Sequence, residues 1–215
     1  MKDYQAIIFD MDGVIIDSEP LHERAYLELF EELGYAENHG VNFDDYIGRT
    51  DKALIEDFVA KHKPAFTVED LSDRKKDRFL QIMREEEPIF EDLPELVARL
   101  AAVYPLAVAS GSLHPVIDAV LALKNLRQYF RFCVSSSDVI HGKPAPDIFL
   151  HAAKLLKVEP GACCVIEDSA AGVTAARAAG MDVIAITNSL PRAKLGHANC
   201  IVDSYEEIDQ LLLAS

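Results

Sequence analysis

The segment Ala6-Ile7-Ile8-Phe9-Asp10-Met11-Asp12-Gly13 decides how the rest of the chain is interpreted. Its apolar run is long enough for a buried strand, and two carboxylates follow with one residue between them. Gly13 then allows a sharp turn. Because an unpaired buried carboxylate is costly, Asp10 and Asp12 need a compensating cation, which a hard divalent metal with oxygen ligands would supply. Taken alone, the pattern also fits a solvated Asp/Gly turn, so the interpretation depends on partners further along the chain.

The composition narrows the range of partners. The 215 residues are 50% hydrophobic, which is enough for a sizeable core, and the net charge is −15. This charge argues against nucleic acid or an anionic membrane as the main partner. A small anionic substrate remains compatible, because a metal and one or two lysines can invert the local field.

The sequence predicts a cytoplasmic protein. It has no apolar run long enough to cross a membrane, and its N-terminus lacks a basic region followed by a cleavable apolar segment. The four cysteines show no C-x-x-C spacing and are expected to be reduced. They are Cys133, Cys163, Cys164 and Cys200.

Hydrophobic periodicity divides the chain into a split α/β core and a helical insert. Apolar strands that alternate with helices predict a Rossmann-like parallel sheet covered on both faces, a three-layer α/β/α arrangement. Residues 1–16 and 89–215 are assigned to this core, and residues 17–88 to an α-helical domain with a short element at 41–48. The predicted strands are 6–9, 106–109, 131–135, 163–166, 183–186 and 201–202. The predicted helices are 21–34, one capped by Asp51, 68–87, 95–103, 116–123, 146–156, 169–179 and 205–213.

Polar residues follow the predicted strands, where ligands bind in open parallel sheets. Ser110-Gly111-Ser112 follows 106–109 and offers hydroxyls and a free amide for phosphate oxygens. Glu167-Asp168-Ser169 follows 163–166, and Lys143 is predicted to open a helix with the help of nearby prolines. In isolation these segments also fit a plain loop, a helix cap and a solvated lysine. Their order along the chain favours a common site.

The chain resembles the haloacid dehalogenase-like phosphohydrolases. The acid pair, hydroxyl, lysine and second acid pair match the order of the four motifs of this family. Lys143-Pro144-x-Pro146-Asp147-x-Phe149 and Glu167-Asp168-Ser169-x-x-Gly172 are similar to its third and fourth motifs. The resemblance covers the whole chain, and it is strongest to β-phosphoglucomutase-like and phosphoglycolate-phosphatase-like members. It implies that 17–88 is a helical cap domain that closes over the site.

The resemblance also implies roles for particular residues. Asp10 would be the nucleophile, and Asp12 the general acid and base. Mg²⁺ would bind the Asp10 carboxylate, the Asp12 backbone carbonyl and Asp168, with Glu167 as a direct or water-mediated ligand. Ser110, the Gly111 amide and Lys143 would bind the phosphoryl oxygens. In the helical insert, His22 and Arg49 are substrate-binding candidates, and Lys75 and Lys76 are weaker ones.

The sequence is compatible with four functions. The first is a phosphatase acting on a small phosphorylated metabolite, such as a sugar phosphate, through an aspartyl-phosphate. The second is a β-phosphoglucomutase-type phosphomutase, which would protect that intermediate from water. The third is a dehalogenase, a branch of the family that lacks the second aspartate and the metal, and Asp12 with Glu167 and Asp168 argues against it. The fourth is a non-catalytic binding protein that retained the fold.

Overall fold

The computed structural model describes residues 3–46 and 51–213. The chain forms two compact units, one made of Met1–Asp17 and Pro88–Ser215, the other of Ser18–Glu87. None of the described helices is both long and apolar enough to cross a bilayer.

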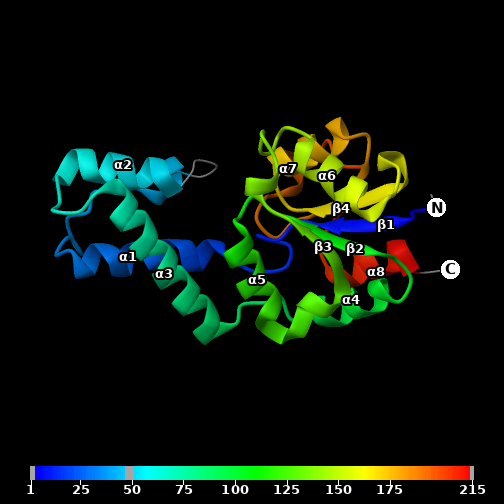
Figure 1. The fold of residues 1–215 in the computed structure, drawn as a ribbon, viewed down its shortest axis with the longest axis horizontal. Helices are drawn as coiled ribbons and strands as arrows, with labels where there is room; N and C mark the ends of the chain where they lie inside the picture. Colours follow the sequence, from blue (N-terminus) through cyan, green and yellow to red (C-terminus); the bar gives the residue numbers. More distant parts are fainter. Residues whose placement is uncertain (1–2, 47–50, 214–215) are drawn as a thin grey trace. The chain divides into compact units, whose positions relative to one another are not determined.

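Six parallel strands form the sheet of the first unit within the described residues, in the order β3-β2-β1-β4-β5-β6. Figure 1 labels the strands from β3 to β4. The central strand β1 is fully buried, and its Ile8 pairs with Ala107 on one side and Val165 on the other. The apolar run that opens the chain is therefore the middle of the sheet. The strands are β1 (Ala6–Phe9), β2 (Leu106–Ala109), β3 (Phe130–Val134), β4 (Cys163–Glu167), β5 (Asp182–Ile186) and β6 (Cys200–Val202).

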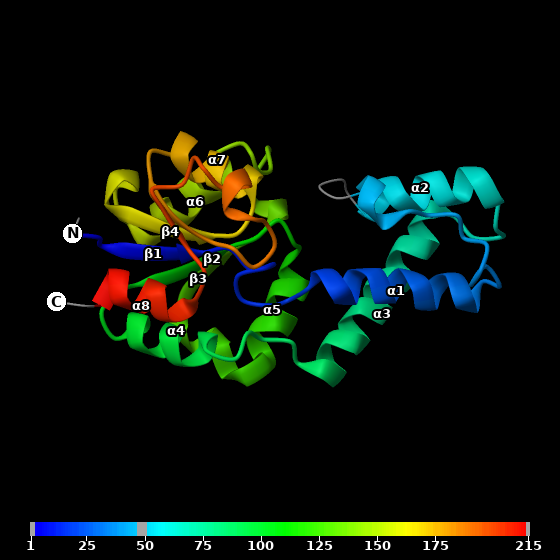
Figure 2. The same cartoon turned by 180° about the vertical axis from the view of Figure 1, so that it is seen from behind.

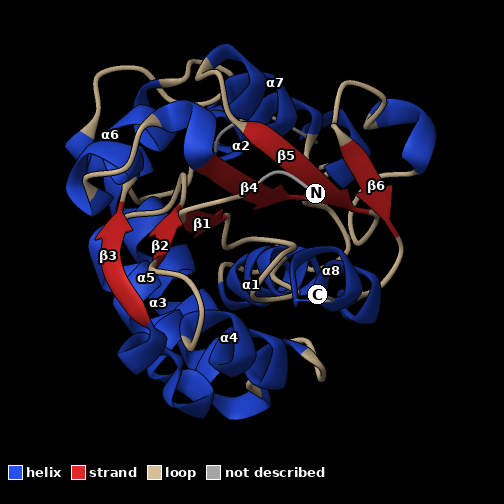
Figure 3. Ribbon diagram, turned by 90° about the vertical axis from the view of Figure 1, so that its right-hand side faces the viewer, coloured by secondary structure: helices blue, strands red, loops and turns tan. Residues whose placement is uncertain are grey.

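Helices cover both faces of this sheet, which confirms the predicted α/β architecture (Figure 3). Helices α6 and α7 lie on one face, and α4, α5 and α8 on the other. Alanines of α7 such as Ala175 and Ala176 pack with strand residues Val165 and Val183 in one buried cluster. The helices are α4 (Leu93–Ala101), α5 (His114–Ala122), α6 (Asp147–Leu156), α7 (Ala170–Ala178) and α8 (Tyr205–Leu213).

Several boundaries differ from the predictions by one or two residues. Strand β3 begins at Phe130 rather than at residue 131, because Phe130 pairs with Leu106 of β2. Its buried ring packs edge-on against Phe9 with centroids 5.7 Å apart. The predicted helix 95–103 begins earlier, at Leu93, with Pro94 in its first turn. Short 3₁₀ segments at Leu123–Tyr129 and Ser136–Asp138 were not predicted. The remaining 3₁₀ segments of this unit are Pro160–Ala162 and Arg192–Lys194.

The second unit contains helices and no strand in its described part, as predicted (Figure 2). Its core joins three helices through aromatic and aliphatic side chains, and the Phe30 and Phe58 rings stack at 4.4 Å. Gly34, at φ +83°, follows the end of α1 where a glycine stop is expected. The predicted element at 41–48 is a 3₁₀ turn, Phe43–Tyr46, and residue 48 lies outside the described residues. The helices are α1 (Glu19–Glu32), α2 (Asp51–His62) and α3 (Val68–Glu86).

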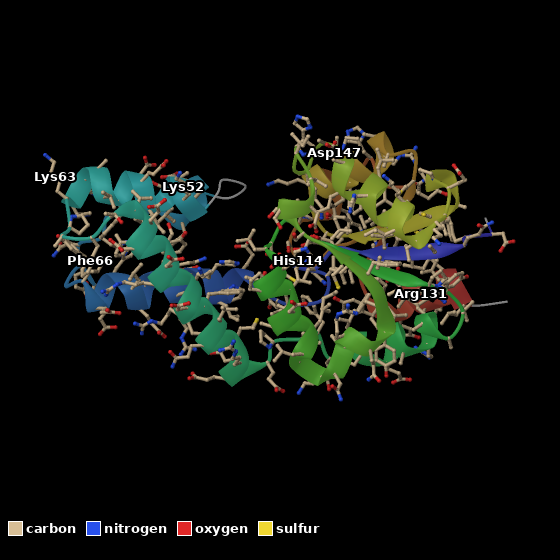
Figure 4. The ribbon with its side chains drawn as sticks, in the orientation of Figure 1. Lys52, Lys63, Phe66, His114, Arg131 and Asp147 are labelled. Carbon is tan, nitrogen blue, oxygen red and sulfur yellow. The ribbon has the colours of Figure 1, made fainter. Side chains whose placement is uncertain are left out.

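Polar contacts fix how α3 begins and how it pairs with α1. Thr67 and Asp70 form a capping box, in which Thr67 Oγ1 accepts from the Asp70 N–H at 3.1 Å. Arg78 donates to Glu32 of α1 at 2.6 Å. Phe66, labelled in Figure 4, lies 4.1 Å beneath the Arg74 guanidinium. The capping box explains the sharp start of α3 directly after residue 67, and the Arg78–Glu32 pair joins α3 to α1.

Candidate active site

Three neighbouring strands bring the predicted acids and the serine to one edge of the sheet. Phe9 of β1 pairs with Val108 of β2 and with Ile166 of β4, so the residues that follow these strands are adjacent. The Asp10 N–H donates to the Ile166 carbonyl at 2.9 Å, so the parallel pairing of β1 with β4 continues as far as Asp10. The carboxyl ends of β1, β2 and β4 therefore meet where the sequence predicted a site.

A buried acid cluster lies at this edge. Among the described residues, Asp10, Glu167 and Asp168 each place a carboxylate oxygen within 4.8 Å of the others. Lys143 Nζ is 2.7 Å from Asp10 Oδ1 and 2.7 Å from Glu167 Oε1. Glu167 is fully buried, and the Lys143 side chain is 12% exposed. The structure thus brings together four of the predicted residues, and two of the three carboxylates contact the one ammonium group.

Burial dominates the electrostatics of the cluster. It raises the pKa of Asp10 well above the usual range, although Lys143 opposes the shift. Burial, and then repulsion from Glu167, raises the pKa of Asp168 to about 7. Burial alone would lower the pKa of Lys143, but Asp10 and Glu167 outweigh it and the pKa is raised. The pKa of Glu167 is lowered in spite of burial, because Lys143 and Ser169 stabilise its charge.

This donor set fits a divalent cation. With all four groups ionised, three negative charges face one positive charge, and Asp10 and Asp168 are the acids whose ionisation the protein disfavours. Carboxylate oxygens are the ligands that Mg²⁺ and Ca²⁺ prefer. A bound divalent ion would balance the remaining charge.

Glu167 is held by donors on both of its oxygens. Oε1 accepts from Lys143, and Oε2 accepts from the backbone N–H groups of Asp168 and Ser169, each at 2.8 Å. The Ser169 hydroxyl also donates to Oε2, at 2.9 Å, and accepts from the Gly172 N–H as the N-cap of α7. The acidic segment is therefore both a helix cap and part of the cluster, and its two interpretations from sequence are compatible.

Gly172 leaves the space that the Glu167 carboxylate occupies. A Cβ at this position would overlap both Glu167 oxygens and its carboxyl carbon, whereas a Cβ at Gly196 would meet nothing within 4 Å. We expect Gly172→Ala to lower the free energy of unfolding by about 1–3 kcal/mol through overpacking. Helix propensity alone would instead favour alanine by about 1 kcal/mol. Urea denaturation measures the sign of the change in the free energy of unfolding, with Gly196→Ala as the control. A Gly172→Ala variant more stable than the wild type would contradict this placement of Glu167.

Lys143 reaches the cluster from a loop and does not open a helix, so that detail of the sequence prediction was wrong. Helix α6 begins at Asp147, after two prolines that lack backbone N–H groups. The Lys143 ammonium also lies 4.9 Å from the centre of the Phe149 ring in the first turn of α6. The loop directs the Lys143 side chain toward the cluster. The Phe149 ring and the carboxylates of Asp10 and Glu167 then hold its ammonium group in place.

The Asp12 side chain lies against the serines that follow β2. Its Oδ2 accepts from Ser112 Oγ at 3.2 Å and from Ser110 Oγ at 3.5 Å. Ser110 is buried, whereas Gly111 is exposed. His114, the first residue of α5, is labelled in Figure 4 and contacts Asp138 at 2.8 Å. This contact links the segments that follow β2 and β3. The structure thus places the Asp12 carboxylate against both serines that follow β2.

The structure describes His22, Lys75 and Lys76 among the substrate-binding candidates of the helical unit. Arg49 lies outside the described residues. His22 stacks on Phe79 at 4.3 Å, and its Nδ1 lies 2.5 Å from Lys75 Nζ. Lys75 is 2% exposed and its ammonium is 4.7 Å from the centre of the Tyr26 ring. The unit therefore holds a half-buried histidine against a buried lysine, while Lys76 pairs with Asp73 at the surface.

Sequence reasoning missed Asn188 and Ser189, which follow β5. Ser189 Oγ donates to Asp168 Oδ2, and Asn188 Nδ2 donates to the Gly13 carbonyl at 2.7 Å. The strand at 183–186 was predicted, so the rule that selected the residues after the other strands would have found this pair as well.

Comparison with known proteins agrees with this geometry. The family model for haloacid dehalogenase-like hydrolases matches residues 4–180. The chain belongs to this family. It is 35% identical over 190 residues to the fructose-1-phosphate phosphatase YqaB of Escherichia coli (strain K12), covering 84% of this chain and 95% of the relative. It is 31% identical to hexitol phosphatase B of the same organism, covering 84% of this chain and 82% of the relative.

A solved structure has a similar fold over almost the whole chain. The candidate beta-phosphoglucomutase from Thermotoga maritima superposes with a TM-score of 0.82 at 28% identity, covering 97% of this chain and 98% of the other. The family assignment made from the four motifs is confirmed.

Proposed function

We propose that this hydrolase is a phosphatase that releases phosphate from a small sugar or sugar-alcohol phosphate. The observation that carries the proposal is the Lys143 ammonium, held 2.7 Å from both Asp10 and Glu167 inside the buried acid cluster. A phosphomonoester dianion repels a carboxylate nucleophile, so a phosphatase of this kind must cancel charge before reaction. The names of the two bacterial relatives support the sugar phosphate class.

Mg²⁺ is the metal that we propose for this site. Asp10, Asp168 and the backbone carbonyl of Asp12 would hold it, in line with its preference for few carboxylates and several waters. Glu167 would contribute through water, because Lys143, Ser169 and the Asp168 N–H already donate to its oxygens. When bound, the ion would neutralise the phosphoryl oxygens and the ionised nucleophile.

The protein groups would then carry out two displacements. A carboxylate oxygen of Asp10 forms a bond to phosphorus as the ester P–O bond breaks, and Asp12 gives its proton to the leaving alcohol. A water molecule next attacks the aspartyl-phosphate and gives a proton back to Asp12, so phosphate leaves and Asp10 is regenerated. Lys143, Ser110 and the Gly111 N–H would hold the phosphoryl oxygens throughout.

Loss of the Asp12 carboxylate should slow turnover without removing the nucleophile. We expect Asp12→Ala to lower kcat by about 10²-fold or more, the usual scale for general acid–base help. Initial rates of phosphate release from a hexose phosphate measure the effect, and Asp118→Ala, at an exposed position of α5, is the control. A variant that keeps most of the wild-type kcat would exclude Asp12 as the acid.

A panel of phosphorylated sugars and sugar alcohols tests the proposed activity. Phosphate release is measured with the metal-free protein, with added Mg²⁺, and with Mg²⁺ plus excess EDTA. We expect release that depends on Mg²⁺ and is strongest for one sugar class. Absence of release from every compound and from p-nitrophenyl phosphate would reject the phosphatase and favour a binding protein.

A phosphomutase is the second candidate, favoured by the similarity over almost the whole chain to the Thermotoga maritima structure. Incubation with β-glucose 1-phosphate and a trace of the bisphosphate separates the two functions. Isomerised sugar phosphate would identify a mutase, and free phosphate a phosphatase.

Two further roles belong to the same proposal. We assign His22 and Arg49 of the helical unit, the proposed cap domain, to recognition of the sugar. The pair of His22 with Lys75 would orient the imidazole for this purpose. We also propose a cytoplasmic location, which suits the free thiols of all four cysteines, each within the described residues.

A further inference from the structure

The turn after β5 contacts the proposed metal site from a side that the four motifs do not include. Ser189 Oγ donates a hydrogen bond to Asp168 Oδ2. Asn188 Nδ2 donates to the Gly13 carbonyl at 2.7 Å and to the Tyr205 hydroxyl oxygen at 2.9 Å. These neighbouring residues therefore hold two separate parts of the site, the second acid pair and the turn after Asp12.

Ser189 and Gly13 together fix the orientation of the Asp168 carboxylate. A Cβ on Gly13 would overlap Asp168 Oδ2 and approach Ser189 Oγ to 2.6 Å, so this oxygen is packed against the Gly13 backbone. Because Ser189 bonds to Asp168 Oδ2 and the Gly13 backbone packs against it, Oδ1 is the oxygen of Asp168 that is available to a cation. Asp168 would then act as a ligand through one oxygen only.

Asn188 acts on the turn that carries the Asp12 backbone carbonyl. Gly13 has φ +73°, and its N–H donates to the Ile16 carbonyl at 2.8 Å. The Gly13 carbonyl is fixed by Asn188, and the next carbonyl, of Val14, accepts from the buried Tyr205 hydroxyl at 2.8 Å. Asn188 and Tyr205, which are far from this turn in the sequence, therefore hold it in place. By holding the turn, they also fix the direction of the Asp12 carbonyl that precedes it.

We propose that Asn188 and Ser189 are positioning residues of the metal site. Ser189 holds Asp168 Oδ2 and so orients the other carboxylate oxygen toward the cation, and Asn188 holds the turn that presents the Asp12 carbonyl. The inference rests on the proposed Mg²⁺-dependent function. Partners that orient metal ligands typically change metal affinity or activity by about 10–100-fold when they are lost.

Calorimetric titration of the metal-free protein with Mg²⁺ tests the role of Ser189. We expect Ser189→Ala to weaken Mg²⁺ binding by about 10-fold, and Ser189→Thr, which keeps the hydroxyl, to restore it. The control is Ser204→Ala, which removes a hydroxyl that accepts from the Glu207 N–H at the start of α8 and does not contact the site. Its Mg²⁺ affinity should equal that of the wild type.

Asn188→Leu tests the second half of the inference. It keeps the approximate size of the side chain, adds no charge and removes the amide donor to the Gly13 carbonyl, so we expect weaker Mg²⁺ binding here as well. If Ser189→Ala and Asn188→Leu bind Mg²⁺ as tightly as wild type, while the wild type hydrolyses its substrate, only this inference fails. Equal weakening by Ser189→Ala and Ser204→Ala would also overturn it. A wild type that neither binds Mg²⁺ nor releases phosphate would reject the proposed function itself.

Discussion

Replacement of Asp10 by asparagine is expected to abolish phosphate release, with a loss of at least about 10⁴-fold in kcat, because an amide oxygen is a poor nucleophile and only binding and electrostatic stabilisation remain. The substitution preserves the shape of a side chain whose oxygen lies 2.7 Å from Lys143. Phosphate release under saturating Mg²⁺ and substrate measures the effect. Acid-quenched wild-type protein should carry one phosphoryl group by mass spectrometry, and the variant none.

The variant should remain folded, so that the loss is a chemical effect. Three buried carboxylates lie close together around Lys143, which contacts two of them, and removal of one negative charge relieves their repulsion. We therefore expect metal-free Asp10→Asn to unfold at a urea concentration no lower than that of the wild type. Substantial Mg²⁺-dependent hydrolysis by a folded Asp10→Asn variant would disprove the nucleophile assignment.

The sheet and most of the acid cluster could be predicted from the sequence because they depend on short-range patterns. Apolar runs at 6–9, 106–109 and 163–166 mark the central strands, and parallel pairing places the residues after them side by side. Asp10, Ser110 and Asp168 follow from that rule alone. The resemblance to the family added their roles, which the pattern of residues does not contain.

The parts that were missed depend on contacts between distant segments. The start of β3 at Phe130 goes with its pairing to Leu106 and its edge-on contact with Phe9, which are tertiary contacts. The pair of His22 with Lys75 spans 53 positions and two helices, and neither residue has a local signal for it. Ser189 is different, because it follows a predicted strand. It was overlooked since a serine and an asparagine after a strand are also ordinary loop residues.

Lys143→Ala should damage both stability and catalysis. Its ammonium is the partner of Asp10 and of the fully buried Glu167, so its removal leaves uncompensated buried charge. Removal of one partner of such a pair costs about 3–5 kcal/mol. We expect a free energy of unfolding lower by this amount in urea without metal, and a kcat lower by about 10²–10³-fold, the scale for loss of one electrostatic contact to the reacting group. Lys154→Ala, at an exposed position of α6, is the matched control.

Two further measurements separate the structural from the chemical effect of Lys143. Saturating Mg²⁺ should recover part of the stability of Lys143→Ala, since it supplies positive charge to Asp10 and Asp168, but it should not recover kcat. Lys143→Arg keeps the charge and should recover stability more than activity, because a planar guanidinium does not replace a compact ammonium held 2.7 Å from two different carboxylates. If Lys143→Ala with saturating Mg²⁺ matched the wild type in kcat, the lysine would have no role in binding the phosphoryl oxygens, and charge balance in the metal-free protein would be its whole function.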